Sequence, residues 1–380
     1  MSDRVSAIEY IRGLAMLGVV GIHTGAYSLN NPDVNLHLFA ALEIFTRFSV
    51  PIFFFVSAFG LFWRYQPEEP FHYGAFLRRR LRAVLLPYLV WSLFYMAHYS
   101  WSAGESRLWD VQTVVEYLLF GLASYQLYFL VILIWFYLLM PLWRALVPLL
   151  IRRPVSSLAG LLILQIAFNY YSSYCLLPDS DNYFWRTAIQ YRLSYWVLHY
   201  VFVFLLGAVC AVRFADFSAL LARYRRTIAA FFLATLSFML AGYYWLILHD
   251  RYTPAEAVNT VHQLSPEGML YTLASCLFFF DLLQRPLPPR FARWLGLLAR
   301  YSFPVYLIHP LIMHYLDNWL AAAGQAMTTP VVIGFYVVTV AGSLYFGALV
   351  HKLGALAPGI GSALAGASFR PAAKGKSTGD

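Results

Sequence analysis

The chain has 380 residues, of which 61% are hydrophobic and only 12% charged, and several of its apolar runs exceed 18 residues. This composition excludes an ordinary soluble protein and predicts an all-α, polytopic membrane protein. The net charge of +9 does not indicate nucleic-acid binding, because the arginines lie between apolar runs, and the three scattered cysteines predict neither disulfides nor a metal site.

About ten membrane-spanning helices are predicted, with both termini in the cytoplasm. This topology places 22 of the 27 Lys and Arg residues on the inner side, as the positive-inside rule requires. Residues 1–355 are expected to form one transmembrane domain, and residues 356–380, rich in Gly, Ala, Ser and Lys, a flexible cytoplasmic tail. The predicted spans are 8–28, 42–63, 83–101, 127–148, 155–175, 193–213, 227–248, 267–284, 301–321 and 330–350.

The first span carries two ionisable residues within an apolar sequence, IEYIRGLAMLGVVGIHTG over residues 8–25. Arg12 and His23 are eleven residues apart, which is about three helical turns or roughly 16 Å, so they share one face. Ionisable groups in a membrane helix indicate a functional site, although a core histidine and an anchoring arginine would give the same pattern. The glycines at 18, 21 and 25 predict close approach of other helices or of a long ligand.

The second span begins with Glu43 and Arg47 at i and i+4, an arrangement that favours an ion pair. The pair is either structural or borders the pocket that contains His23. The following loop ends in FLRRRLRAVLLPY, with four arginines at positions 78, 79, 80 and 82. These arginines could bind phosphates by forked hydrogen bonds, and ordinary positive-inside charge or lipid headgroup binding explains them equally well.

The outer loops, residues 102–126, 176–192 and 249–266, are rich in aromatic and polar residues. They are expected either to cover a polar substrate or to anchor the protein at the interface. Residues 111–123 are amphipathic and too short to span, which predicts an interfacial helix.

Later spans add further polar residues. In the fourth span, Gln126 and Tyr128 either bind a polar ligand or belong to an aromatic belt. The ninth span contains His309, His314 and Asp317 between or after two prolines, which free backbone carbonyls for a cavity. Asp281 and His199 stand alone in their spans and are expected to be structural.

Five of these segments together resemble the bacterial acyltransferase 3 family of integral membrane acyltransferases, in the order typical of that family. They are YIRGLAMLGVVGIH, RFSVPIFFFVSAFGLF, FLRRRLRAVLLP, YQLYFL and YSFPVYLIHP. The chain departs from the family pattern at Ala58, where a glycine is usual after Ser57, and at residues 126–130, where His-Leu-Trp-Phe-Leu is usual. The second of these segments, with Arg47, Val50 and Pro51, is similar to the corresponding segment in the branch of the family that acetylates surface polysaccharides or their lipid-linked precursors.

The resemblance implies an O-acetyltransferase of the cell inner membrane, with acetyl-CoA as donor and a polysaccharide or lipid-linked saccharide as acceptor. No permanently bound cofactor and no nucleic-acid partner are implied. His23 and Arg12 would be catalytic, with His23 acting as general base or carrying the acyl group itself. Arg78, Arg79, Arg80 and Arg82 would hold CoA, and Glu43, Arg47, Ser57, Gln126, Tyr128 and His309 would contact substrate. The alternative is an exporter of a glycan or lipid-linked sugar that performs no chemistry, although the chain lacks the half-repeats usual in transporters.

Overall fold

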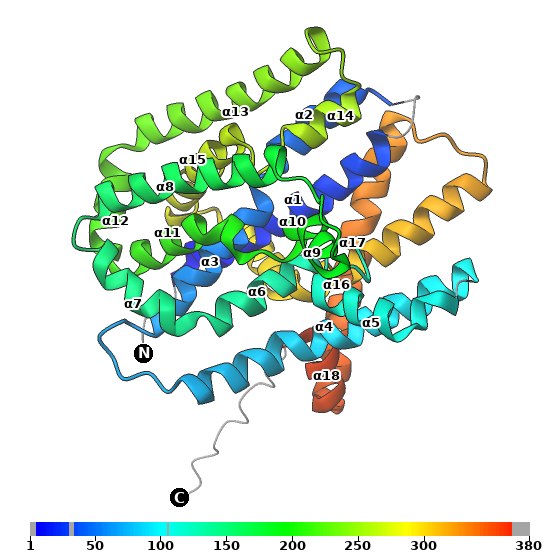
Figure 1. Ribbon diagram of the computed structural model, residues 1–380, viewed down its shortest axis with the longest axis horizontal. Coiled ribbons are helices and arrows are strands. Elements are labelled where there is room, and N and C mark those ends of the chain that lie inside the picture. Colours follow the sequence, from blue (N-terminus) through cyan, green and yellow to red (C-terminus); the bar gives the residue numbers. More distant parts are fainter. Residues whose placement is uncertain (1–4, 30–33, 105, 367–380) are drawn as a thin grey trace, which may run out of the picture.

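The computed structural model describes residues 5–29, 34–104 and 106–366, and every regular element within them is a helix. The all-α class predicted from the composition is therefore confirmed. The long helices are α1 (Ser6–Leu29), α4 (Tyr73–Ala103), α8 (Pro154–Tyr170), α13 (Arg225–Leu248), α15 (Pro266–Gln284), α16 (Pro289–Ala322) and α17 (Thr329–Leu356). In Figure 1 they form one bundle, with α13 along one edge and α4 along the opposite edge.

Several predicted spans are made of two shorter helices. α2 (Leu36–Thr46) and α3 (Ser49–Arg64) together form one long apolar unit. α6 (Tyr128–Leu138) and α7 (Met140–Leu150) meet at 71°, and η3 (Val197–Tyr200) with α11 (Val201–Val212) meets α12 (Phe214–Arg223) at 100°. The α6–α7 bend has a local cause, because Pro141 lacks a backbone N–H and is favoured in the first turn of a new helix.

Short helices connect these spans. α5 (Val111–Phe120) occupies the segment for which an interfacial helix was predicted, and it ends at Gly121 in the left-handed conformation (φ 72°). Its position relative to the membrane stays a prediction. The other connecting helices are η1 (Ser106–Trp109), η2 (Tyr171–Cys175), α9 (Tyr183–Gln190), α10 (Arg192–Tyr195) and α14 (Pro254–Thr260).

Within the described residues, seven helical segments are long and apolar enough to cross a membrane, or nine if each bent pair is one span. This confirms a multi-pass membrane protein. The first predicted span, α1, is not among them although it has 24 residues, because Arg12, His23 and its glycines lower its hydropathy. The count of ten spans and the cytoplasmic placement of both termini therefore stay predictions.

α1 lies inside the bundle and packs against α2, α3, α15, α16 and α17. Its glycines face the junction of α2 and α3 so closely that added methyl groups would be in tight contact or would overlap. The pairs are Gly18 with Ser49, Gly21 with Thr46 and Gly25 with Glu43. The predicted close approach at these glycines is thus confirmed, and the neighbour is another helix. A polar helix can be tolerated in this position because protein surrounds it.

Arginine-bearing helix ends gather at one end of the bundle. Arg144 of α7 donates hydrogen bonds to four backbone carbonyls in residues 65–69, just after α3, at 2.7 to 3.0 Å. Arg213 donates to the carbonyl of Ile151, in the turn between α7 and α8, at 3.2 Å. In Figure 1 these helix ends lie at the left, on the same side as the N-terminus. This arrangement agrees with the charge asymmetry on which the topology prediction was based.

A helix, α18 (Pro358–Ala365), begins the segment that was predicted to be a flexible tail. The indole of Trp91 in α4 donates a hydrogen bond to the carbonyl of Leu364 at 3.1 Å, and Gly366 lies against the backbone of Ala83. An apolar helix thus packs on α4 over residues 358–365, and the division into a transmembrane domain and a flexible tail stays a prediction. Residues 367–380 lie outside the described part of the chain.

Candidate active site

Two imidazole rings face each other where α1 meets α16. The rings of His23 and His309 stack with their centroids 5.4 Å apart and their planes at 25°. Tyr125, from the loop between α5 and α6, packs on His23 with ring centroids 4.4 Å apart. His23 is half-buried and makes no hydrogen bond to any residue that the structure describes. Its ring nitrogens are therefore available to a ligand.

His309 is completely buried, and one of its nitrogens is fixed by the backbone. Its Nδ1 lies 3.1 Å from the carbonyl oxygen of Val305, whereas its Nε2 is buried without a partner. A neutral ring donates from Nδ1 to this carbonyl, which leaves the lone pair of Nε2 for a ligand or for His23. The nearby carbonyl of Tyr306 lacks its helical donor because Pro310 has no N–H. The ninth span thus contributes polar groups to this place, and a cavity beside its two prolines stays a prediction.

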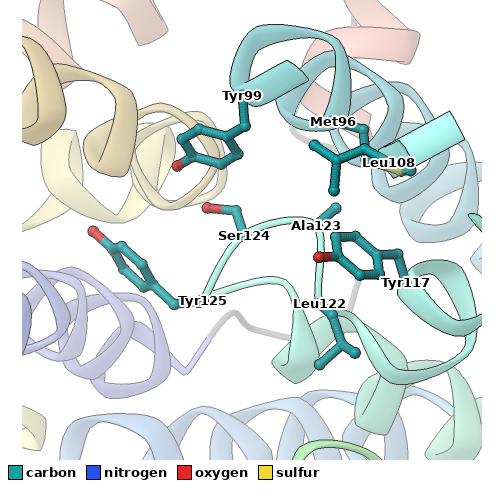
Figure 2. Close-up of a pocket in the computed structure, with 8 residues that line it drawn as sticks. All are labelled: Met96, Tyr99, Leu108, Tyr117, Leu122, Ala123, Ser124 and Tyr125. Carbon is teal, nitrogen blue, oxygen red and sulfur yellow. The ribbon is translucent and has the colours of Figure 1, made fainter. Parts of the chain in front are cut away.

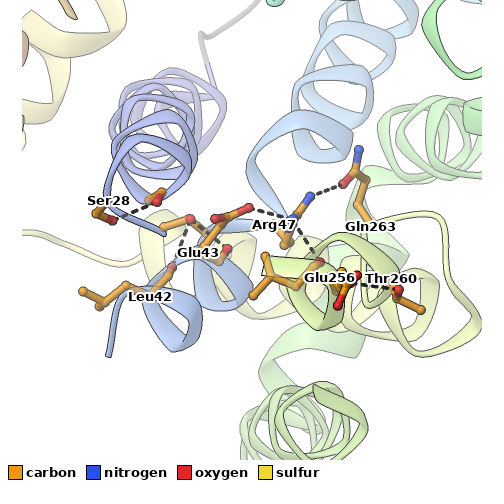
Figure 3. Close-up of polar contacts among 10 residues, drawn as sticks. Ser28, Leu42, Glu43, Arg47, Glu256, Thr260 and Gln263 are labelled. Atoms are coloured by element: carbon orange, nitrogen blue, oxygen red, sulfur yellow. Dashed lines mark hydrogen bonds and ion pairs between the residues drawn. The ribbon is translucent and has the colours of Figure 1, made fainter. Parts of the chain in front are cut away.

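The ion pair predicted between Glu43 and Arg47 is present and borders the same site. Nη2 of Arg47 lies 2.6 Å from Oε1 of Glu43, and both side chains are largely buried. Arg47 also donates to Oε1 of Gln263 at 3.4 Å and to the carbonyl of Val258 at 3.2 Å. Figure 3 shows Arg47 reaching from the α2–α3 junction to Glu43 on one side and to Gln263 on the other. Arg47 is also close enough to His23 to act on the charge of its ring.

The loop between α14 and α15 closes over Arg47 from outside the spans. His262 in this loop accepts a hydrogen bond at Nδ1 from the backbone N–H of Leu264, at 3.0 Å, and its ring stacks on Tyr174. Burial, together with the positive charge of nearby Arg47, lowers the pKa of His262 to about 4. The arrangement agrees with one of the two alternatives for residues 249–266, a cover over polar groups.

Gln126 and Tyr128 lie at the start of α6, directly after Tyr125. The carbonyl of Gln126 accepts a hydrogen bond from the hydroxyl of Tyr306. The side-chain amide of Gln126 is only 2% exposed, and its one polar side-chain neighbour, the hydroxyl of Tyr95, forms no well-aligned bond with it. Tyr128 lies beside Tyr200 and near Arg47. Buried amides are normally well hydrogen-bonded, so Gln126 is compatible with a polar ligand at this place.

Two predicted groups lie away from the imidazole pair. Arg12 is half-buried on α1, eleven residues or about 16 Å before His23. The four arginines of α4 do not form one cluster on the surface. Those at 78, 79 and 82 are exposed, whereas Arg80 is half-buried, with its guanidinium 5.8 and 5.7 Å from the ring centroids of Phe76 and Tyr137.

The remaining predicted residues have distinct environments. Ser57 lies ten residues after Arg47 on the way to the arginine-rich end, and no contact links it to the imidazole pair in the described chain. Asp281 is buried and paired with Arg225 at 3.5 Å and with Arg285, which confirms a structural role. His199 is buried, and its Nε2 lies 2.8 Å from Oγ of Ser172, so it is structural as expected.

Three residues of the site were not predicted: Tyr125, His262 and Gln263. Tyr125 begins the YQLYFL segment, so its neighbours were considered while its own contact with His23 was not. No periodicity could have revealed that contact, because Tyr125 lies in a turn and not on a helix face. His262 and Gln263 join the site only because the outer loop folds back over Arg47.

Comparison with known proteins adds independent support. The model of a family described as an acyltransferase domain matches residues 5–348. A putative membrane-bound acyltransferase, YfiQ of Bacillus subtilis (strain 168), is 22% identical over 349 residues, which cover 90% of each chain. No solved structure matches the chain.

Proposed function

The chain belongs to the acyltransferase 3 family, and from this premise we propose that it transfers an acetyl group from cytoplasmic acetyl-CoA to a hydroxyl of a surface polysaccharide or its lipid-linked precursor. The proposed location is the cell inner membrane. The observation that carries the proposal is the imidazole pair, because a partly accessible His23 faces a fixed His309 inside a membrane bundle. His23 makes no hydrogen bond within the described chain, so its ring can take part in proton transfer while the backbone fixes His309.

In the proposed reaction, the acceptor hydroxyl attacks the carbonyl carbon of the thioester. His23 takes the hydroxyl proton, a new C–O ester bond forms and the C–S bond breaks. The proton then passes to the CoA thiolate, so that the products are the acetyl ester and CoA thiol. His309 positions the His23 ring, and Arg47 supplies positive charge near the oxygen that becomes negative during the attack. Attack by His23 itself on the thioester is the alternative route.

The first half of α4 is the proposed donor site. Arg78, Arg79 and Arg82 are exposed there and could hold phosphates by forked hydrogen bonds. Thirteen residues after Arg82, about 20 Å along the same helix, the hydroxyl of Tyr95 donates to the carbonyl of Leu307 at 2.7 Å. Leu307 lies two residues before His309. The pantetheine arm of CoA is about 15–20 Å long, so it could extend over most of the distance between the arginines and Tyr95.

The decisive experiment measures acetyl transfer by the purified protein in lipid nanodiscs. The donor is radiolabelled acetyl-CoA, and the acceptor is surface polysaccharide extracted from the producing cells and de-esterified with mild base. His23→Ala should reduce turnover by about 10²–10⁴-fold, the usual contribution of a positioned base, with acetyl-CoA binding retained. If His23→Ala transfers acetyl groups at close to the wild-type rate, the mechanism is wrong. Absence of any transfer by the wild-type protein would favour the exporter.

The donor site has a separate test. The triple change of Arg78, Arg79 and Arg82 to Gln should raise the KM for acetyl-CoA much more than that for polysaccharide, and added salt should weaken the remaining binding. Arg226→Gln is the matched control, because it removes an exposed arginine from the same end of the bundle on another helix. Equal changes in both KM values would exclude the arginines as the phosphate site.

A further inference from the structure

A pocket of about 380 Å³ opens beside the imidazole pair, where Tyr125 packs on His23. Its volume lies within the range of small-molecule sites, roughly 300–1,000 Å³. α4, η1, α5 and the loop that follows α5 form its walls. The lining residues are Met96, Tyr99, Leu108, Tyr117, Leu122, Ala123, Ser124 and Tyr125, and none of them is charged.

The pocket has one polar side. Figure 2 shows the hydroxyl groups of Tyr99, Ser124 and Tyr125 turned to the same side, away from Leu108 and Leu122. Tyr99 and Tyr125 are close enough for their hydroxyls to interact, and Tyr27 of α1 lies near both. The polar side therefore faces the elements that carry the two histidines.

Two buried polar groups without a well-formed hydrogen bond support a ligand here. Ser124 is only 4% exposed, and the nearest polar neighbour of its hydroxyl is the hydroxyl of Tyr99, which forms no well-aligned bond with it. Two residues later, the buried amide of Gln126 has only the hydroxyl of Tyr95 as a comparable neighbour. Buried polar groups are normally hydrogen-bonded, so their retention in one short loop supports a polar occupant.

Tyr125 separates the pocket from the imidazole pair. One face of the residue lines the pocket, and its ring packs on His23 with centroids 4.4 Å apart and lies 6.5 Å from the ring of His309. Its hydroxyl donates to the sulfur of Met313 on α16 at 3.7 Å. A molecule in the pocket thus needs to pass only one side chain to reach His23.

We infer that this pocket binds the acceptor, as an uncharged saccharide residue that stacks on the Tyr rings and bonds to the hydroxyls of Tyr99, Ser124 and Tyr125. A sugar ring offers apolar C–H faces and a rim of hydroxyls, which matches aromatic walls with a polar side. A phosphate would find no cation among the lining residues and is excluded from this position. The inference rests on the proposed acetyl transfer and specifies its acceptor side.

The test compares acceptor and donor parameters in pocket variants. Tyr125→Ala and the pair Ser124→Ala with Tyr99→Phe should each raise the KM for de-esterified polysaccharide at least about tenfold, with an unchanged KM for acetyl-CoA. A methyl glycoside should compete with the polysaccharide, whereas glycerol phosphate should not. Leu119→Ala, an exposed change on α5 outside the pocket, is the matched control and should change neither KM.

Direct binding distinguishes failure of the inference from failure of the proposed function. Fragments of the same polysaccharide are titrated by microscale thermophoresis onto the protein in nanodiscs without acetyl-CoA. Suppose that the wild-type protein transfers no acetyl group but binds the fragments, and that the pocket variants lose this binding. This result would support the pocket as a saccharide site and overturn the proposed acetyltransferase function. Wild-type transfer with unchanged acceptor KM and binding in all pocket variants would overturn the pocket alone. Tyr125→Phe should restore most of the binding lost in Tyr125→Ala if ring stacking dominates.

Discussion

Single residues of the site differ in how far the sequence alone could identify them. His23 and Arg12 were found because helical spacing places them on one face of an otherwise apolar helix. The Glu43–Arg47 pair followed from the i, i+4 rule and is present. His309 was recognised as polar in a proline-containing span, yet its stacking on His23 depends on how α1 crosses α16. A pairing between helices far apart in the sequence has no local pattern.

The role of His309 can be tested without removing the proposed base. Because its Nδ1 is held by the Val305 carbonyl and its Nε2 faces the site unpartnered, His309→Ala removes one hydrogen bond next to a charge-developing group. We expect kcat to fall roughly 10- to 100-fold, the equivalent of about 1.4–2.7 kcal/mol, with little change in the KM for acetyl-CoA. His249→Ala, an exposed histidine at the end of α13, should have no effect. A fall in protein abundance equal to the fall in rate would argue for a structural role only.

At the scale of elements, helix existence was predictable and helix breaks were not. Nearly all predicted spans contain a helix in the right place, because long apolar runs leave few alternatives in a bilayer. The 71° bend was missed because the apolar sequence continues from α6 into α7, and the 100° bend lies just after the span predicted over residues 193–213. The outer loop over Arg47 was predicted as a segment, but its hydrogen bonds to that arginine depend on tertiary folding.

Close helix packing gives a stability prediction for glycines. A methyl group on Gly207 of α11 would overlap the carbonyl of Phe55 in α3, where backbone cannot easily move. Gly207→Ala should therefore destabilise the protein by about 1–3 kcal/mol, typical of overpacking. Gly334→Ala in α17 is the matched control, because nothing lies within 4 Å of its new Cβ and alanine is the better helix former. Thermal unfolding in detergent should show a lower Tm for the first variant and an unchanged or higher Tm for the second.

The outer loop should loosen in acid because of His262. Burial, with added effects from Arg47 and His199, lowers its pKa from 6.5 to about 4, so the folded loop requires a neutral ring. Protonation then favours the open loop, and the stability present above pH 6.5 is lost as the pH falls toward 4. Hydrogen exchange of residues 253–265, corrected for intrinsic rates, should therefore rise between pH 7 and pH 5. A His262→Gln variant should lose this pH dependence, and an unchanged slope in the variant would assign it to another group.

At the scale of the whole molecule, the charge asymmetry of the sequence predicts which side each helix end occupies. The hydrogen bonds of Arg144 and Arg213 hold neighbouring helix ends together, so arginines on which the predicted orientation rests also close one end of the bundle. The sequence showed the asymmetry in charge. It could not show that these arginines bond to backbone carbonyls, because their partners lie in turns more than 60 residues away in the chain.

The predicted orientation can be tested with cysteines that the chain already contains. Of the three, only Cys175 is exposed, at the end of η2, where the topology places the outer surface; Cys210 and Cys276 are buried. A membrane-impermeant maleimide should therefore label the wild-type protein in cells whose outer envelope has been made permeable and whose inner membrane is intact. In a Cys175→Ser background, Gly359→Cys on α18 should react only after the inner membrane is permeabilised, because α18 lies on the predicted inner side. Asn259→Cys, exposed on α14, should behave like Cys175. Labelling of both Cys175 and residue 359 while the inner membrane is intact would mean an even number of spans between them instead of the predicted five, and would move either the arginines of α4 or the proposed acceptor pocket to the wrong side for acetyl transfer.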